Sequence, residues 1–160
     1  MIGILSDSHD NLTMIRRAVS VFRSAECNLV VHAGDIVAPF AAAELAETGC
    51  PVNAVFGNCD GERAGLVRAF QAFGEIREGP WSFEHAGLTI LVTHIEDSRL
   101  TTEPRTAWDL HVCGHTHKAE VRKEDNRMIV NPGETCGWVN GIGTVALFDP
   151  ERRIAEIIPL

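Results

Sequence analysis

Apolar and polar positions alternate in a regular order along the first half of the chain. Three short apolar runs predict buried strands, at residues 1–5, 28–33 and 52–56. After each run comes a polar loop and then a predicted helix, at residues 12–22, 38–47 and 64–73; in the first, apolar residues recur every three or four positions, as in an amphipathic helix. Strands this apolar, in strand–loop–helix order, predict a parallel sheet with right-handed crossovers.

Residues at the helix ends agree with these boundaries. Asn11 or Asp10 is the expected N-terminal cap of the first helix. Pro39 falls in the first turn of the second helix, where proline is tolerated, and Gly49 suits its end.

The second half of the chain has a different pattern, dominated by short strands. Residues 81–85 and 88–93 flank Ala86-Gly87 and predict a hairpin. Residues 97–108 are expected to be partly helical, limited by Pro104. Further strands are expected at residues 110–113, 119–123, 128–130, 143–148 and 153–158.

Composition narrows the class of protein. With 160 residues, 45% of them hydrophobic and 22% charged, the chain is expected to form a single domain over residues 1–160. A formal charge of −8 argues against stable binding of duplex nucleic acid, which needs a basic face.

Location is also an expectation from composition. Five cysteines without a C-x-x-C pair fit reduced thiols, so a cytoplasmic protein is expected. The strand-like start leaves no room for a signal peptide, and no apolar run approaches the roughly 18 residues that span a bilayer.

Candidate chemistry gathers where predicted strands end. Five strand ends carry only Asp, His and Asn as metal-donor side chains: Asp7 and His9, Asp35, Asn58, His94, and His115 with His117. Ligands of open α/β sheets bind beyond the carboxyl ends of strands. One such end is explained as a helix cap or polar loop, but five in succession predict a shared site with oxygen and nitrogen donors.

Other residues have simpler interpretations. Cys113 with His115 and His117 would suit a lone structural zinc site, but this leaves the four earlier strand ends unexplained. His32 is expected to be an interior side chain with satisfied hydrogen bonds. Asn131 either orients a metal ligand or the substrate without binding the metal itself, or simply belongs to an Asn-Pro-Gly turn.

The motifs together resemble one known family, the calcineurin-like metallophosphoesterases. Its blocks stand here in family order as Asp7-Ser8-His9, Gly34-Asp35, Gly57-Asn58-Cys59-Asp60, Thr93-His94 and Gly114-His115-Thr116-His117, with Asn131-Pro132-Gly133 similar to the closing motif. The chain looks most like the small phosphodiesterases of bacteria and archaea. The resemblance implies an α/β fold, a four-layer αββα sandwich of two mixed β-sheets flanked by helices.

The resemblance also implies two divalent metal ions. Carried over position by position, Asp7, His9 and His117 would bind the first ion and Asn58, His94 and His115 the second, with Asp35 bridging both. A metal-bridging hydroxide would attack phosphorus in line. Because no thiolate is among the donors, Mn, Ni, Fe, Co or Zn would suit the site, and Mg alone less well.

Two blocks depart from the family pattern. Many relatives have histidine where this chain has Cys59, and a thiol is a poor substitute for imidazole in protonating a leaving group. Asp60 or water would then protonate the leaving group, or good leaving groups would be preferred; Cys59 as a small packed side chain is the simpler alternative. In the fourth block His94 runs into Ile95-Glu96 instead of Gly-His.

The expected function is hydrolysis of a phosphodiester, with a small phosphate ester or nucleotide as substrate. The alternative is a protein-binding scaffold, because the same fold includes a retromer subunit that resembles the enzymes after losing ligands. Completeness of all seven ligand positions favours the enzyme. Relatives are often homo-oligomers, so self-association is expected by analogy.

Overall fold

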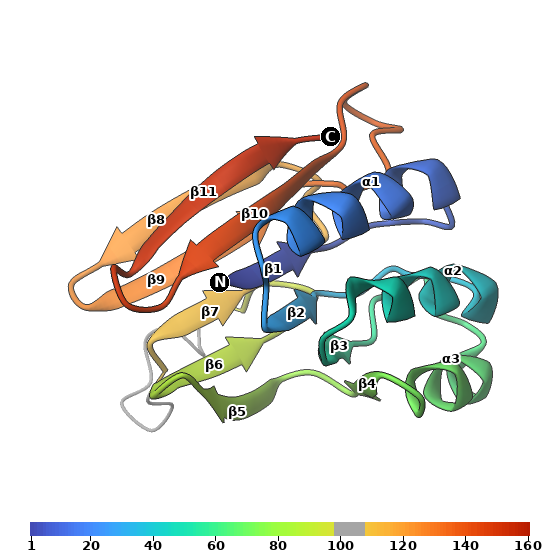
Figure 1. Ribbon diagram of the computed structural model, residues 1–160, viewed down its shortest axis with the longest axis horizontal. Helices are drawn as coiled ribbons and strands as arrows, with labels where there is room; N and C mark the ends of the chain where they lie inside the picture. Colours follow the sequence, from blue (N-terminus) through green and yellow to red (C-terminus); the bar gives the residue numbers. More distant parts are fainter. Residues whose placement is uncertain (98–107) are drawn as a thin grey trace.

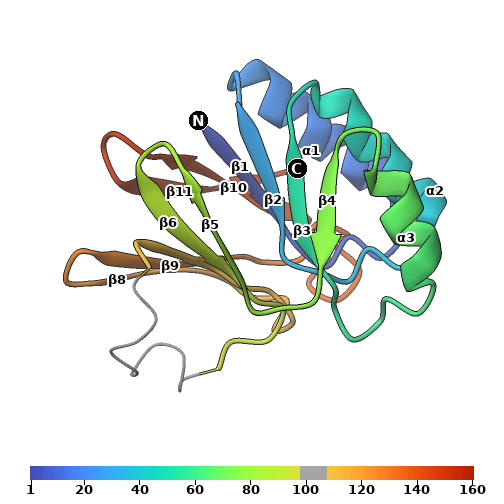
Figure 2. The same ribbon diagram turned by 90° about the horizontal axis from the view of Figure 1, so that it is seen from below.

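The computed structural model describes residues 1–97 and 108–160 as two β-sheets packed face to face, with helices on the outer face of one sheet (Figures 1 and 2). The first sheet has the order β11 (Ile154–Pro159), β10 (Thr144–Asp149), β1 (Ile2–Leu5), β2 (Leu29–His32), β3 (Val52–Val55) and β4 (Gly74–Arg77). The second has the order β5 (Trp81–His85), β6 (Leu88–Val92), β7 (Leu110–Val112), β9 (Arg127–Pro132) and β8 (Ala119–Glu124).

Both sheets are mixed. Strands β1 to β4 run parallel, as the alternation of strands and helices predicts. Strand β10 pairs antiparallel with β1, and β11 pairs antiparallel with β10. In the second sheet, β6, β7 and β9 are parallel, and β5 and β8 pair antiparallel at its edges. The expected α/β class with two mixed sheets flanked by helices is confirmed.

Two apolar cores hold the layers together. Between the sheets, side chains such as Ile4, Val31 and Val112 are fully buried. Between the first sheet and the helices, a second cluster of buried apolar side chains includes Phe22 and Leu66. Removing this much apolar surface from water is the main force that stabilises the fold.

The helices are α1 (Leu12–Ser24), α2 (Pro39–Ala43) and α3 (Arg63–Phe70), with a 3₁₀ helix η1 (Glu44–Thr48) after α2. Asn11 caps α1, because its side chain accepts the N–H of Met14 at 3.3 Å. None of the helices in the described part of the chain is long and apolar enough to cross a membrane.

The second predicted helix is not continuous, which corrects the expectation for residues 38–47. It tightens into 3₁₀ geometry at Glu44, a common ending for short helices. Residues three apart line up in a 3₁₀ helix, so Leu45 and Thr48 are buried together before Gly49 ends the turn at φ 74°.

Strand β4 was not predicted, because only Ile76 in Gly74–Arg77 is apolar and buried. Gly74 permits the pairing, since a Cβ there would lie 1.9 Å from the carbonyl oxygen of Val52. The remaining predicted strands are present, and their ends differ from the predicted ones by at most two residues. The partly helical segment expected at 97–108 falls almost entirely on residues 98–107, outside the described residues.

Candidate metal centre

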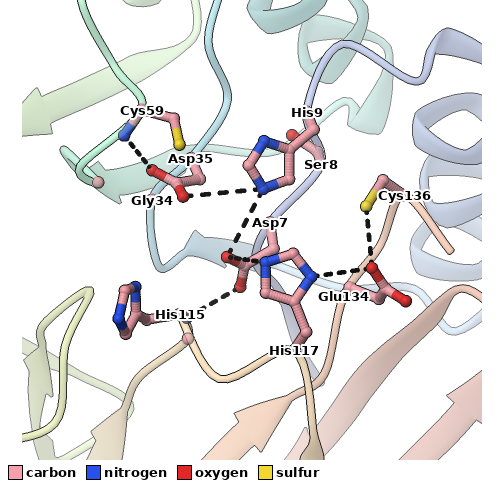
Figure 3. A network of polar contacts seen from close by, with 12 residues as sticks. Asp7, Ser8, His9, Gly34, Asp35, Cys59, His115, His117, Glu134 and Cys136 are labelled. Carbon is pink, nitrogen blue, oxygen red and sulfur yellow. Dashed lines mark hydrogen bonds and ion pairs between the residues drawn. The ribbon is translucent and has the colours of Figure 1, made fainter. Parts of the chain in front are cut away.

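All five donor-bearing loops meet at one seam between the two sheets. Asp7, Asp35 and Asn58 follow β1, β2 and β3 of the first sheet, whereas His94 and the pair His115 and His117 follow β6 and β7 of the second. The side chains point toward one another, as Figure 3 shows for most of them. Strand ends that are far apart in sequence therefore supply a single cluster.

The donor atoms lie at distances typical of a shared cation. His117 Nε2 is 3.4 Å from Asp7 Oδ1, and His94 Nε2 is 3.4 Å from Asp35 Oδ2. His9 Nε2 lies 3.9 Å from Asp7 Oδ1 and 3.7 Å from Asp35 Oδ2. Ligands held about 2.0–2.2 Å from one ion are separated from each other by roughly 3 to 3.5 Å. The distances made by His117 and His94 fall in this range, whereas those made by His9, at 3.7 and 3.9 Å, are slightly longer.

Asn58 completes the other side of the cluster. Its Oδ1 lies 2.9 Å from His94 Nε2 and 2.9 Å from His115 Nδ1. All seven predicted donors are thus brought together, with Asp35 between the Asp7 group and the Asn58 group.

Two buried donor atoms lack a hydrogen-bond partner among the described residues. They are Asp7 Oδ1 and His9 Nε2, and both face the centre of the cluster. A buried polar atom without a partner costs free energy that a cation would recover. The donor set therefore fits divalent metal ions chemically, with two carboxylates, neutral imidazoles and an amide oxygen.

The backbone of these loops is strained in a consistent way. Positive φ angles occur at five of the donors: Asp7 (52°), His9 (39°), Asp35 (61°), His115 (66°) and His117 (59°). Residues other than glycine rarely adopt this conformation, and it persists only where surrounding contacts enforce it. Here the loops brace each other, since Asp7 N–H donates to the Gly34 carbonyl and His9 N–H to that of Asp35, both at 3.0 Å.

Electrostatics differ between the two buried carboxylates. Burial raises the pKa of Asp7, and the neighbouring Ser6 hydroxyl, the imidazoles of His94 and His117 and the N–H of His115 offset this only in part. Burial also opposes ionisation of Asp35, but contacts with His94 and with the N–H of Cys59 outweigh it and lower its pKa. Asp35 is therefore held as a carboxylate, which suits a group placed between two donor sets.

The two candidate catalytic residues occupy different environments. Cys59 is an exposed residue at the cluster. Partial desolvation of its thiol, together with the nearby Asp35 carboxylate, raises its pKa to about 11, so the thiol stays protonated at neutral pH. Asp60 is buried, and its two oxygens accept four backbone N–H groups, from Asp35, Ile36, Val37 and Gly57, at 2.7–3.0 Å. These hydrogen bonds fix the loop that carries Asp35. Because both carboxylate oxygens of Asp60 already accept hydrogen bonds, the geometry does not favour proton transfer from Asp60.

A residue that the sequence analysis missed lies directly behind His117. Glu134 is 1% exposed, and its Oε2 accepts the Nδ1 hydrogen of His117 at 2.9 Å (Figure 3). Burial raises the pKa of Glu134, but the hydrogen bonds from His117 and from the N–H groups of Asn140 and Val139 outweigh it and lower the pKa to about 2. Its only sequence signal is an acidic residue directly after the Asn131-Pro132-Gly133 motif.

Several neighbouring predictions are resolved by the same contacts. His32 is buried with both ring nitrogens bonded, to Ser8 Oγ at 3.0 Å and to the N–H of Gly34 at 3.1 Å, so it is an interior side chain. Asn131 donates to the Gly114 carbonyl at 2.9 Å and thereby holds the His115–His117 loop. Cys113 packs with Trp108 and other apolar residues, and it is not part of any donor group among the described residues.

The donor cluster opens into two hollows. One of about 290 Å³ is lined by His9, Asp35, Asn58, Cys59, His115, His117, Cys136, Trp138 and Val139. The other, of about 630 Å³, shares Asn58 with it and extends along His94, Phe56, Arg63 and Pro80. Both are large enough for a small organic phosphate.

The fold and the donor cluster define a class: an α/β protein with a candidate divalent-metal site at the carboxyl ends of strands from two sheets. The chain belongs to the calcineurin-like phosphoesterase superfamily, whose domain model matches residues 1–153.

Individual relatives agree with this assignment. A phosphodiesterase of Methanocaldococcus jannaschii is 34% identical over 156 residues, covering 95% of this chain and 94% of its own length. A probable metallophosphoesterase of Methanothermobacter thermautotrophicus is 31% identical over 163 residues, covering 99% of this chain and 91% of its own length. The solved structure of an archaeal phosphodiesterase superposes with a TM-score of 0.89 at 31% identity, with 99% of each chain covered.

Proposed function

We propose that this chain is a metal-dependent phosphodiesterase that acts on small phosphate diesters. The observation that carries the proposal is the convergence of seven donors, with Asp7 Oδ1 and His9 Nε2 buried and lacking other partners among the described residues. Asp7, His9 and His117 would hold one divalent ion, Asn58, His94 and His115 a second, and Asp35 would contact both.

The chemistry that such ions supply when bound is a lowered pKa of water, which provides the nucleophile, and positive charge beside the phosphate. The protein contributes the orientation of each donor. Asp7 and Asp35 cancel only part of the charge of two divalent ions, and the imidazoles and Asn58 cancel none. The site would thus attract an anionic diester to a chain whose formal charge is −8.

Among the described residues, the third block supplies no imidazole that could protonate the leaving group. Cys59 stands at the third block, and Asp60 is engaged by four backbone N–H groups. We therefore infer that Asp60 is a positioning residue and that diesters with good leaving groups, which need little proton donation, are hydrolysed best.

The test is hydrolysis of bis(p-nitrophenyl) phosphate by protein stripped with a chelator and reloaded with Mn, Ni, Fe, Co or Zn, with metal content measured by elemental analysis. Activity should depend on metal and exceed activity on the monoester p-nitrophenyl phosphate. Asp35→Asn should lose at least about 100-fold in kcat, since it removes charge next to the nucleophile.

Asp125→Asn is the matched control, because Asp125 also has a positive φ but lies exposed in the β8–β9 turn. It should retain full activity. A folded, metal-loaded protein that is inactive on both substrates with every metal would refute the enzymatic proposal and favour the scaffold.

A further inference from the structure

Large apolar side chains are exposed at the rim of the candidate metal centre. Trp138 is 67% exposed and Val139 is 71% exposed, in the loop that follows Cys136. The other two tryptophans, Trp81 and Trp108, are only 8% and 4% exposed. An indole left open to water is unfavourable for folding alone, so its placement calls for a reason outside the apolar core.

The position of Trp138 points to the contents of the smaller hollow. Trp138 and Val139 line the same 290 Å³ space as His9, Asp35 and His117. The lining of this space therefore combines metal-donor side chains with an uncharged aromatic side chain. A molecule that fills it could place a phosphate against the donors and a flat apolar group against the indole.

The loop is fixed relative to the donors. Glu134 accepts the Nδ1 hydrogen of His117 at 2.9 Å and the N–H of Val139 at 3.1 Å, and also the N–H of Asn140. Asn140 Nδ2 in turn donates to the carbonyl of His117 at 2.8 Å. The backbone directly after Trp138 is thus bonded to Glu134, which also accepts a hydrogen bond from His117 of the donor cluster, and this holds the loop that carries the indole beside the site.

We propose that Trp138 is a stacking platform for the aromatic ring, a nucleobase or an aryl group, of the diester's non-leaving side. This inference rests on the proposed function and names its substrate class: nucleoside phosphodiesters or their aryl equivalents. Stacking on an indole tolerates any base, because every base has a π-face, and it needs no cationic surface. It therefore suits an acidic chain in which positive charge is confined to the metal site.

The kinetic test compares two diesters with the same leaving group: thymidine 5′-p-nitrophenyl phosphate and methyl p-nitrophenyl phosphate. Trp138→Ala should lower kcat/KM for the thymidine diester about tenfold, mostly through KM, and change the methyl diester less than about twofold. Trp138→Phe should restore most of the loss. Ile142→Ala is the matched control: Ile142 is 60% exposed nearby and is not among the described residues lining the hollow, so both substrates should be unaffected.

A second readout does not depend on turnover. In the Zn-loaded protein, thymidine 5′-monophosphate should quench the emission of the one strongly exposed tryptophan, and the quench should vanish in Trp138→Phe. If neither diester is hydrolysed by the wild-type protein, the proposed function fails, while the quench still decides whether Trp138 stacks on a base.

Two results would overturn the inference. One is an equal loss of kcat/KM on both diesters in Trp138→Ala, together with a quench by thymidine 5′-monophosphate that persists in Trp138→Phe. A platform that stacks on nucleobases must distinguish the thymidine diester from the methyl diester. The other is a shift from dimer to monomer in Trp138→Ala by sedimentation, which would assign the apolar rim to contact with a second copy of this chain.

Discussion

For two of the imidazoles, a hydrogen bond decides which ring nitrogen is free to bind a cation. His94 donates through Nδ1 to the carbonyl of Ala33 at 2.8 Å, so its Nε2 lone pair faces Asp35. His117 donates through Nδ1 to Glu134, so its Nε2 faces Asp7. Fixing the tautomer in this way spares a metal ion the cost of orienting its ligands.

Glu134 should therefore matter for metal affinity although it is not itself one of the seven donors. Glu134→Ala should weaken binding of the metal by about 10- to 100-fold, because His117 loses the carboxylate that orients it. Glu134→Gln keeps an acceptor oxygen without the charge, so its loss should be smaller. Competition with a chromophoric chelator measures both, and unchanged affinity in the folded alanine variant would contradict this role.

Cys59 allows a test of the missing imidazole. Cys59→His should raise kcat for an alkyl diester by about tenfold or more, since a positioned general acid contributes 10²- to 10⁴-fold in enzymes that have one. An aryl diester, whose leaving group needs little protonation, should change much less. Cys59→Ala should match the wild type on both, and an equally unresponsive Cys59→His would indicate that this position does not face the leaving group.

At the scale of elements, the site depends on loops that pass very close to one another. Gly57 and Gly114 stand where those loops cross: a Cβ on Gly57 would lie 2.1 Å from Asp35 Oδ1, and one on Gly114 would lie 1.9 Å from Ser6 Oγ. The side chains of Asp60 and Asn131 bond the backbone of the same loops. The strand ends supply the donors, and these contacts set the distances between them.

Gly114→Ala should consequently reduce metal affinity by a larger proportion than it reduces the stability of the fold. The added methyl group would also lie 2.8 Å from Asp7 Oδ2, so the β7 loop must move away from β1. We expect a loss of about 1–3 kcal/mol in the free energy of unfolding, measured in urea, and a larger proportional loss in metal affinity. Gly61→Ala is the control, because nothing lies within 4 Å of a Cβ there; equal behaviour of the two variants would contradict the crowding argument.

How far the sequence predicts these elements depends on how local the signal is. Strands β1, β2 and β3 are predictable because most of their residues are apolar, and the donors because they follow short apolar runs of this kind. Strand β4 has one buried apolar residue and owes its pairing to β3. Glu134 gains its role only from the fold, which sets it behind His117, 17 residues earlier in the chain. A contact between residues far apart in the sequence produces no periodic pattern of apolar and polar positions from which it could be predicted.

For the whole molecule, the site lies where the two sheets meet, and several polar side chains are buried with it. His111 on β7 of the second sheet is fully buried, with Nε2 2.8 Å from Thr93 Oγ1 and its ring packed against Trp108. His32 on β2 is buried in the first sheet. A fold that encloses neutral histidines gains stability only while they stay neutral.

Stability should therefore fall as the solution is acidified, partly through His111. Burial lowers the pKa of His111 to about 4; the charge of Arg122 adds to this shift and that of Glu96 opposes it. In the unfolded chain the same imidazole has a pKa of about 6.5. Between these values the unfolded state binds a proton that the folded state does not, so the free energy of unfolding drops by about 1.4 kcal/mol per pH unit below pH 6.5. Above that pH the contribution is constant. Urea unfolding at pH 7.5, 6 and 5 should give a shallower acid slope for His111→Gln than for the wild type, and parallel profiles would show that the buried ring takes up its proton without unfolding.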